Sequence, residues 1–138
     1  MKTFFTGFSL LLVALAVQAQ TPQKEYIVVK ESGHYWNTKI DSTSEYSVIN
    51  ASRIVVFNGT LPIFKNIGRE INFGVSNEKG EKKTINSKVA GTATYNGEEK
   101  YLVELTFDYN GTEKKTKVIL ADLSSSEFKL IAGKNWLK

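Results

Sequence analysis

The strongest folding signal in this sequence is a repeated Tyr-Asn-Gly tripeptide, which occurs as Tyr95-Asn96-Gly97 and again as Tyr109-Asn110-Gly111. Asn-Gly favours a two-residue type I′ turn, because both central residues need a positive φ that glycine adopts freely and asparagine tolerates. Segments rich in β-branched and aromatic residues flank both turns. The sequence therefore predicts two successive β-hairpins between residues 88 and 120.

The segment between the two turns alternates in the way expected of a half-buried strand. One set of its side chains is apolar or aromatic and the other is mostly polar: Tyr101, Val103, Leu105, Phe107 and Tyr109 against Leu102, Glu104, Thr106 and Asp108. A turn at Asn110-Gly111 sets Leu105 opposite Thr116 and Val103 opposite Val118. We therefore expect a central strand with one face in the core.

Further strand-like segments follow one another at short, regular spacing, and each is rich in β-branched or aromatic residues or alternates in polarity. They are residues 25–30, 45–49, 53–57, 70–76, 82–94 and 127–132. No segment carries a sustained 3.6-residue apolar stripe, so no substantial helix is expected. The prediction is an all-β fold, an antiparallel meander of about 8–10 strands that forms either a single β-sandwich or a small β-barrel.

Residues 53–57, Arg-Ile-Val-Val-Phe, differ from the other segments because their apolar run is continuous rather than alternating. Such a run is typical of a strand that is covered on both faces. It ends at Asn58-Gly59, a third hairpin signal. Pro62 in the returning segment lacks a backbone donor, so residues 60–64 are expected to form an edge strand or a covering loop.

The first 19 residues have the pattern of a cleaved secretory signal peptide, with Lys2, an apolar run from Phe4 to Val17 and the small-residue cleavage pattern Val17-Gln18-Ala19. The run is shorter than the ~18 or more apolar residues of a membrane-spanning helix, so no membrane span is expected. Residues 20–24 form a polar, flexible leader, and residues 25–138 form one domain that is large enough to bury a core.

The chain contains no cysteine. An exported domain without disulfides is more typical of a bacterial periplasmic or secreted protein than of a small extracellular domain of a higher organism. The sequence therefore predicts an exported protein, periplasmic or secreted.

The residue inventory excludes the common catalytic and metal-binding motifs. A Cys-His nucleophile is impossible, and a Ser-His-acid triad would have to use His34, the one histidine. One histidine without cysteine does not build a usual zinc site, and no calcium loop or phosphate-binding glycine motif is present. Glu104 and Asp108 offer a carboxylate pair, but their Cα atoms would stand roughly 13–14 Å apart on one strand. We expect no catalytic residue, metal or cofactor.

Two lysine clusters, at residues 79–83 and 114–117, lie among glutamates and lack interleaved aromatic residues. They are more typical of solvated hairpin ends than of a nucleic-acid site. No nucleic-acid partner is therefore expected, despite the net charge of +4.

The candidate binding residues are His34, Tyr35 and Trp36, the densest aromatic cluster outside the signal peptide. On a strand, Tyr35 points away from the other two, so at least one ring is expected to face solvent, a loop or a groove. Exposed Tyr and Trp rings commonly contact sugars or protein partners. The alternative for Trp36 is a place in the core.

The leading hypothesis is an exported, non-enzymatic β domain that binds a small ligand or an envelope or extracellular protein. An alternative is a structural or assembly subunit that pairs through exposed strand edges. An enzyme that uses scattered carboxylates such as Glu104 ranks third.

Overall fold

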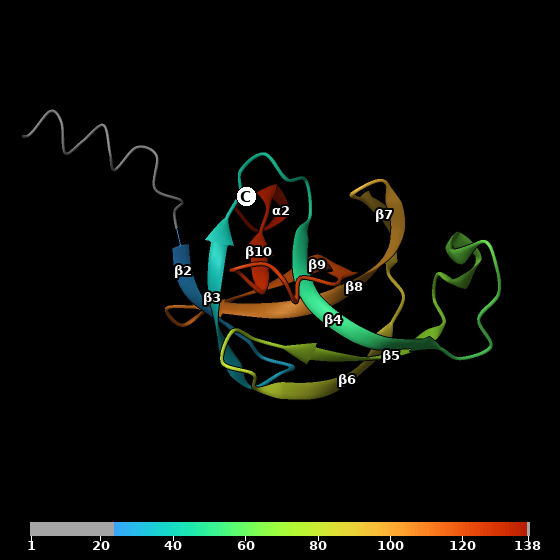
Figure 1. The fold of residues 1–138 in the computed structure, drawn as a ribbon, viewed down its shortest axis with the longest axis horizontal. Helices are drawn as coiled ribbons and strands as arrows, with labels where there is room; N and C mark the ends of the chain where they lie inside the picture. Colours follow the sequence, from blue (N-terminus) through green and yellow to red (C-terminus); the bar gives the residue numbers. More distant parts are fainter. Residues whose placement is uncertain (1–23, 138) are drawn as a thin grey trace, which may run out of the picture.

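Nine strands make up most of the described chain, which is residues 24–137 of the computed structural model (Figure 1). The signal peptide of residues 1–19 and most of the leader lie outside the described residues. The strands are β2 (Lys24–Val29), β3 (His34–Ile40), β4 (Ser47–Val56), β5 (Glu70–Ser76), β6 (Lys82–Lys88), β7 (Gly91–Tyr95), β8 (Glu98–Tyr109), β9 (Thr112–Ala121) and β10 (Leu130–Ala132). Two short helices, η1 (Ile63–Asn66) and α2 (Lys134–Leu137), complete the fold.

Six strands form a closed barrel in the order β10-β3-β2-β8-β9-β4. The three-residue strand β10 closes it, because Leu130 pairs with Thr38 of β3 on one side and with Ile49 of β4 on the other. β5 and β6 extend the sheet from the second half of β4, and β7 adds to β8. The all-β prediction is confirmed, and the barrel is the form that the sequence left open.

The hairpins predicted from Tyr-Asn-Gly are present. Both turns have positive φ at both central residues, 52° and 79° at Asn96-Gly97 and 53° and 85° at Asn110-Gly111. The predicted register of β8 against β9 is also confirmed, with Leu105 opposite Thr116 and Val103 opposite Val118. Local turn chemistry therefore determines this part of the sheet.

Two pairings are parallel, β10 with β3 and β4 with β9, whereas the other seven are antiparallel. A parallel pair joins segments that are distant in sequence, because the chain must cross over between them. Alternation within one strand carries no information about such a partner. The sheet is therefore not a meander along its whole length.

The barrel interior is filled by side chains. Trp36, Phe107, Ile27, Leu105 and Leu130 are fully buried there together with residues of β4 and β9. An eight-stranded barrel is just wide enough for its side chains to fill, and a six-stranded one is narrower. Because side chains fill the interior, candidate binding sites are to be sought on the outer surface of the barrel.

The second half of β4 departs from the prediction of a strand covered on both faces. The register against β5 shifts between Ser52 and Val55, and Arg53 has a φ of 50°, so the strand bulges as it leaves the barrel. Beyond the bulge, no second layer covers the strand, and Ile54, Val55 and Phe57 are exposed. The prediction was therefore wrong for this segment.

Asn58-Gly59 does not turn the chain into an adjacent strand either. Residues 60–64 run through a loop into η1, which is the covering-loop alternative that Pro62 indicated, and β5 is the strand that pairs with β4. The Asn66 side chain fastens this loop: its Oδ1 accepts from Thr60 N at 2.9 Å and its Nδ2 donates to Thr60 O at 3.0 Å.

The segment after β10 is fastened to the barrel by hydrogen bonds from consecutive residues. Gly133 N donates to the buried Ser47 Oγ at 3.0 Å, and Lys134 N donates to Ser44 O at 2.7 Å. Asn135 accepts from Ser47 Oγ at 3.0 Å and donates to Lys117 O at 2.6 Å. These bonds set the position of α2 and of Trp136 within it.

Replacing Gly133 with Ala is expected to lower the free energy of unfolding by about 1–3 kcal/mol. A Cβ at this position would stand 2.5 Å from Tyr46 O and 2.6 Å from Ser44 O, which are backbone atoms that cannot turn aside. Urea titration measures the loss. Gly91→Ala is the matched control, because its Cβ meets Leu102 Cδ1 at an ordinary 3.5 Å. Equal losses in the two variants would contradict the packing argument.

Candidate functional site

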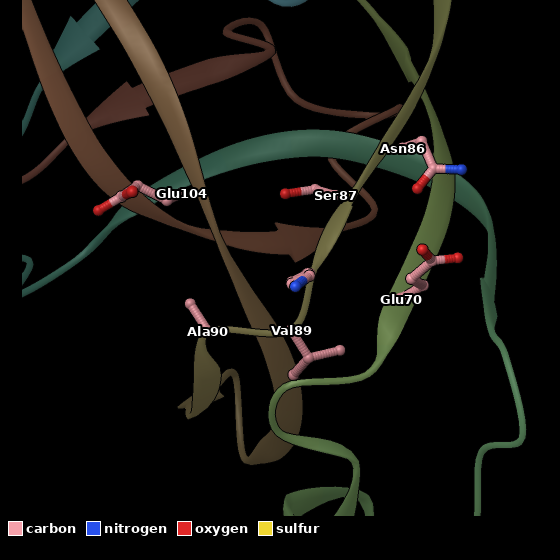
Figure 2. Close-up of a pocket in the computed structure, with 7 residues that line it drawn as sticks. Glu70, Asn86, Ser87, Val89, Ala90 and Glu104 are labelled. Atoms are coloured by element: carbon pink, nitrogen blue, oxygen red, sulfur yellow. The ribbon is translucent and has the colours of Figure 1, made fainter.

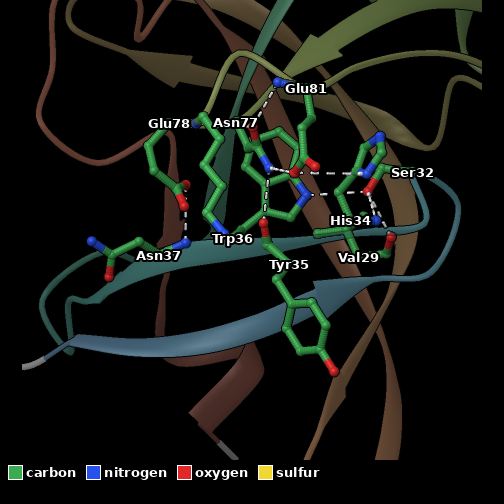
Figure 3. Close-up of polar contacts among 10 residues, drawn as sticks. Val29, Ser32, His34, Tyr35, Trp36, Asn37, Asn77, Glu78 and Glu81 are labelled. Atoms are coloured by element: carbon green, nitrogen blue, oxygen red, sulfur yellow. Dashed lines mark hydrogen bonds and ion pairs between the residues drawn. The ribbon is translucent and has the colours of Figure 1, made fainter.

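The three residues singled out in the sequence lie at the start of β3 but in different environments (Figure 3). Trp36 is fully buried, and its indole Nε1 donates to Ser32 Oγ at 3.1 Å. His34 is partly buried, and the Tyr35 side chain is 63% exposed on the opposite face of the strand. Trp36 thus takes the core alternative, and Tyr35 is the member of the cluster whose ring is exposed.

His34, Ser32 and Glu81 lie together but are not arranged as a catalytic triad. Ser32 Oγ donates to Val29 O at 2.7 Å and accepts from His34 N and Trp36 Nε1, so the hydroxyl does not face the imidazole as a nucleophile would. His34 Nδ1 lies 3.8 Å from Glu81 Oε1. The serine serves the turn before β3 and holds the Trp36 ring.

Side chains from the β5–β6 turn complete the hydrogen bonding of β3 where β10 does not reach. Asn77 Nδ2 donates to Tyr35 O at 2.9 Å, and Glu78 Oε1 accepts from Asn37 N at 3.1 Å (Figure 3). Asn77 Nδ2 also donates to Glu81 Oε1 at 2.7 Å. These polar residues therefore satisfy backbone groups of β3, which is a structural role.

Tyr26 joins Tyr35 on the outer face of the β2–β3 hairpin. Tyr26 lies opposite Asn37 and Tyr35 lies opposite Val28, so the two tyrosines are diagonal neighbours. Tyr26 is 59% exposed. The pair forms an open aromatic face on the hairpin without a hollow of its own.

A second surface is an open cleft of about 510 Å³ between β6, β5 and β8. Glu70 and Glu104 reach it from opposite sides, with Ser87 between them and Asn86 on the same side as Glu70 (Figure 2). Asp108, the suggested partner of Glu104, instead accepts from Gly111 N at 3.1 Å in the hairpin turn. Among residues 24–137, no group of three or more His, Cys, Asp or Glu side chains is placed to hold a metal ion.

The third surface surrounds the rings of Tyr109 and Trp136, and it has the clearest features of a binding site. The two rings meet edge to face, with centroids 5.7 Å apart and planes at 84°. A cleft of about 340 Å³ lies against them, lined by Glu25, Ile40, Ser42, Tyr109, Trp136 and Leu137. A further cleft of about 450 Å³ lies along Tyr109, Asn110, Thr112, Lys114 and Trp136. We call the two together the Tyr109–Trp136 clefts.

Hydrogen bonds hold the two rings in place. Tyr109 Oη donates to Glu25 Oε1 at 2.7 Å, and Lys114 Nζ donates to Trp136 O at 2.9 Å. The neutral phenol is stabilised because it donates a hydrogen bond to the Glu25 carboxylate. The pKa of Tyr109 therefore lies above its ordinary value of 10.0, and burial adds to this effect. Tyr109 is therefore a neutral hydrogen-bonding ring at physiological pH.

The wall contributed by Ser42 is shaped by the turn after β3. Asp41 carboxylate oxygen Oδ1 accepts from Thr43 Oγ1 at 2.6 Å and from Thr43 N at 3.0 Å. These bonds favour the charged form and hold the pKa of Asp41 below its usual range. Asp41 N in turn donates to Ala132 O at 2.9 Å, which joins this turn to β10.

The sequence analysis did not identify the Tyr109–Trp136 clefts. Tyr109 belonged to the apolar face of an alternating strand, and Trp136 stands far from it in sequence. Their meeting depends on the docking of α2, for which no local pattern exists. The one available signal was Trp136 itself, a large aromatic residue in a short segment without a strand pattern.

Within the described part of the chain, no helix is long and apolar enough to cross a membrane. A scan against models of known families finds no match, and neither does a search of curated proteins. Among solved structures, the chain resembles the protein Lpg0085, of unknown function (DUF785), from Legionella pneumophila subsp. pneumophila str. Philadelphia 1. The match has a TM-score of 0.66 at 16% identity and covers 80% of this chain and 79% of that one. This likeness shows a shared fold.

Replacing Glu25 with Gln is expected to lower the pKa of Tyr109 toward its ordinary value, because the charged acceptor of the phenol proton is lost. A pKa raised in the folded state stabilises the fold below the unfolded-state pKa near 10.0, and this contribution is lost as the pH rises through the folded-state value. NMR titration of ring-labelled tyrosine measures the pKa of Tyr109 in the wild type and in Glu25→Gln.

Glu99→Gln, at the other end of β8, is the control for this titration and should leave the pKa of Tyr109 unchanged. A Tyr109 pKa that is the same in wild type and in Glu25→Gln would show that the bond to Glu25 is not its cause.

Proposed function

We propose that this protein is an exported, non-enzymatic binding domain that holds a small, neutral, hydroxyl-rich ligand, of the kind a sugar ring represents, in the Tyr109–Trp136 clefts. The observation that carries the proposal is the edge-to-face pair of aromatic rings, which lines two clefts. Clefts of a few hundred Å³ with an aromatic lining and a few polar groups are the usual form of a small-molecule site.

The apolar part of the site suits one face of a sugar ring. Trp136 and Tyr109 supply flat aromatic surface, and Ile40 and Leu137 extend it in the smaller cleft. Aromatic rings with a polar edge commonly contact ligands that have one apolar face and one hydrated rim. The Leu137 side chain is 45% exposed, so apolar surface remains for a ligand to cover.

The polar part of the site offers both acceptors and donors. Glu25 and Ser42 lie at one cleft, and Asn110, Thr112 and Lys114 lie at the other. One carboxylate and one ammonium group leave the site without a strong net charge. This balance favours a neutral ligand with several hydroxyl groups over an anion or a cation.

The assembly alternative, pairing through strand edges, has less support. β6 ends the β4-β5-β6 part of the sheet, and its exposed residues include Lys82, Lys83 and Lys88. Lysines on an edge strand discourage pairing with another chain. The Tyr26–Tyr35 face is a second candidate surface for the protein partner expected from the sequence, because both rings are exposed on one hairpin.

NMR of the indole N–H groups tests the proposal, because the chain contains two tryptophans, one in the site and one in the core. On titration with methyl β-glucoside and with di-N-acetylchitobiose, the Trp136 signal is expected to shift with saturation. The Trp36 signal should stay in place, because its indole is buried against Ser32. Trp136→Ala is expected to weaken binding by about tenfold or more.

Tyr35→Ala is the control, since it removes an exposed ring from a different face and should leave sugar binding unchanged. Native mass spectrometry of the protein taken gently from its own source complements the titration by detecting a small mass that leaves on activation. The proposal is refuted if native mass spectrometry detects no bound small mass and neither sugar shifts the Trp136 signal. A loss of partner binding in Tyr35→Ala alone would instead favour the Tyr26–Tyr35 face.

A further inference from the structure

Exposed apolar residues concentrate on one projecting segment of the fold, the connection from the end of β4 to β5. Six of the nine large exposed hydrophobic residues in the described chain lie between residues 54 and 67: Ile54, Val55, Phe57, Leu61, Phe64 and Ile67. The Leu61 side chain is 79% exposed. Soluble monomers rarely leave such a cluster uncovered unless it meets a membrane or a partner. We call residues 54–67 the apolar tip.

Part of the apolar tip shares one hollow. Ile54 and Leu61 line the same shallow hollow of about 270 Å³ together with Val56 and Gly59. In Figure 1 the connection extends beyond the end of the sheet, on the side away from β2 and β3. The tip therefore lies apart from the Tyr26–Tyr35 face and does not belong to the Tyr109–Trp136 clefts.

Basic residues predominate around the apolar tip, with Glu70, whose carbonyl accepts from Phe57 N at 3.0 Å, as an acidic neighbour. Between Glu45 and Glu70 the sequence contains no acidic residue, but it contains Arg53, Lys65 and Arg69. All three cations are exposed, and none forms an ion pair with another residue of the described chain. A second copy of the tip would bring like charges together, so the complementary surface is an anionic one.

The backbone of the apolar tip and of the two residues after it is satisfied in part from within. Main-chain N–H groups donate to acceptors in the protein at these positions: Phe57, Gly59, Thr60, Lys65, Ile67, Gly68 and Arg69. Asn66, which is buried, also donates to Tyr101 Oη at 2.6 Å, so the tip is held on β8. Each backbone group that is satisfied within the protein lowers the cost of placing the loop in an apolar environment such as the outer part of a bilayer.

We propose that the apolar tip docks on the surface of a bilayer that contains anionic phospholipid. Leu61, Phe64 and their apolar neighbours enter the boundary between headgroups and acyl chains, and Arg53, Lys65 and Arg69 lie at the headgroups. Apolar burial and attraction of basic residues to anionic lipid act together in such binding. No membrane-spanning segment is required.

Sedimentation with vesicles tests this docking. Vesicles of phosphatidylcholine mixed equally with phosphatidylglycerol are expected to carry the protein down, more so at low salt, and vesicles of phosphatidylcholine alone much less. Leu61→Ser combined with Phe64→Ser should reduce the partition by at least about tenfold, because two exposed apolar groups no longer enter the bilayer. Lys65→Gln combined with Arg69→Gln should reduce it by about fivefold per residue at low salt.

Two matched controls separate docking from general adhesion. Tyr26→Ser with Tyr35→Ser removes exposed rings from another face, and Lys115→Gln with Lys117→Gln removes the same charge from the exposed side of β9. Both should sediment nearly as the wild type does. All the substituted side chains are exposed, so the melting temperature is expected to stay the same and folding can be checked directly.

The proposal is overturned if neither kind of vesicle binds the protein, or if the tip variants sediment like the controls. Light scattering that shows a dimer lost in Leu61→Ser would assign the tip to a second copy of the chain instead. A protein cross-linked from position 61, without vesicle binding, would assign it to a protein partner. Either result replaces the bilayer as the occupant.

Discussion

The fold depends on the two-sided pairing of β10. Leu130 and Ala132 are fully buried, and this short strand hydrogen-bonds to β3 on one side and to β4 on the other. Without it, the barrel would be an open sheet with two unpaired edges facing each other. The same strand determines where Gly133 and α2 lie, and thus where Trp136 meets Tyr109. Closure of the barrel and assembly of the candidate site therefore share one cause.

The parts of the fold that could be predicted from the sequence are those whose information is local. Asn96-Gly97 and Asn110-Gly111 have the backbone geometry that Asn-Gly favours, and the alternation of β8 places Val103 and Leu105 in the core. The parallel pairings are different, because nothing in β10 or β4 alone specifies a distant partner. The continuous run at residues 53–57 was misleading, because a bulge carries that strand past the barrel, where Ile54, Val55 and Phe57 are exposed and only Val56 is partly buried against the core.

The candidate site could be predicted only in part, and for related reasons. The aromatic cluster at the start of β3 was visible in the sequence. Alternation alone, however, does not show which of its rings lies in the core. Ser32 decides this for Trp36 by accepting its indole N–H, and Tyr35 is left outside. Tyr109 and Trp136 come together through the docking of the segment after β10, to which the hydrogen bonds of Asn135 with Ser47 and Lys117 contribute. Such contacts follow from the finished barrel.

The pairing of β10 also has a cost in loop entropy. The residues of the β8–β9 hairpin are neighbours in sequence, so their pairing costs little loop entropy, whereas Leu130 must find Thr38 about 90 residues away. Closing the barrel with β10 therefore costs more loop entropy than forming this hairpin, and an unclosed barrel leaves the edges of β3 and β4 available. An unclosed chain offers the space of β10 to the same strand of another molecule. In the closed barrel, β10 covers both of these edges at once.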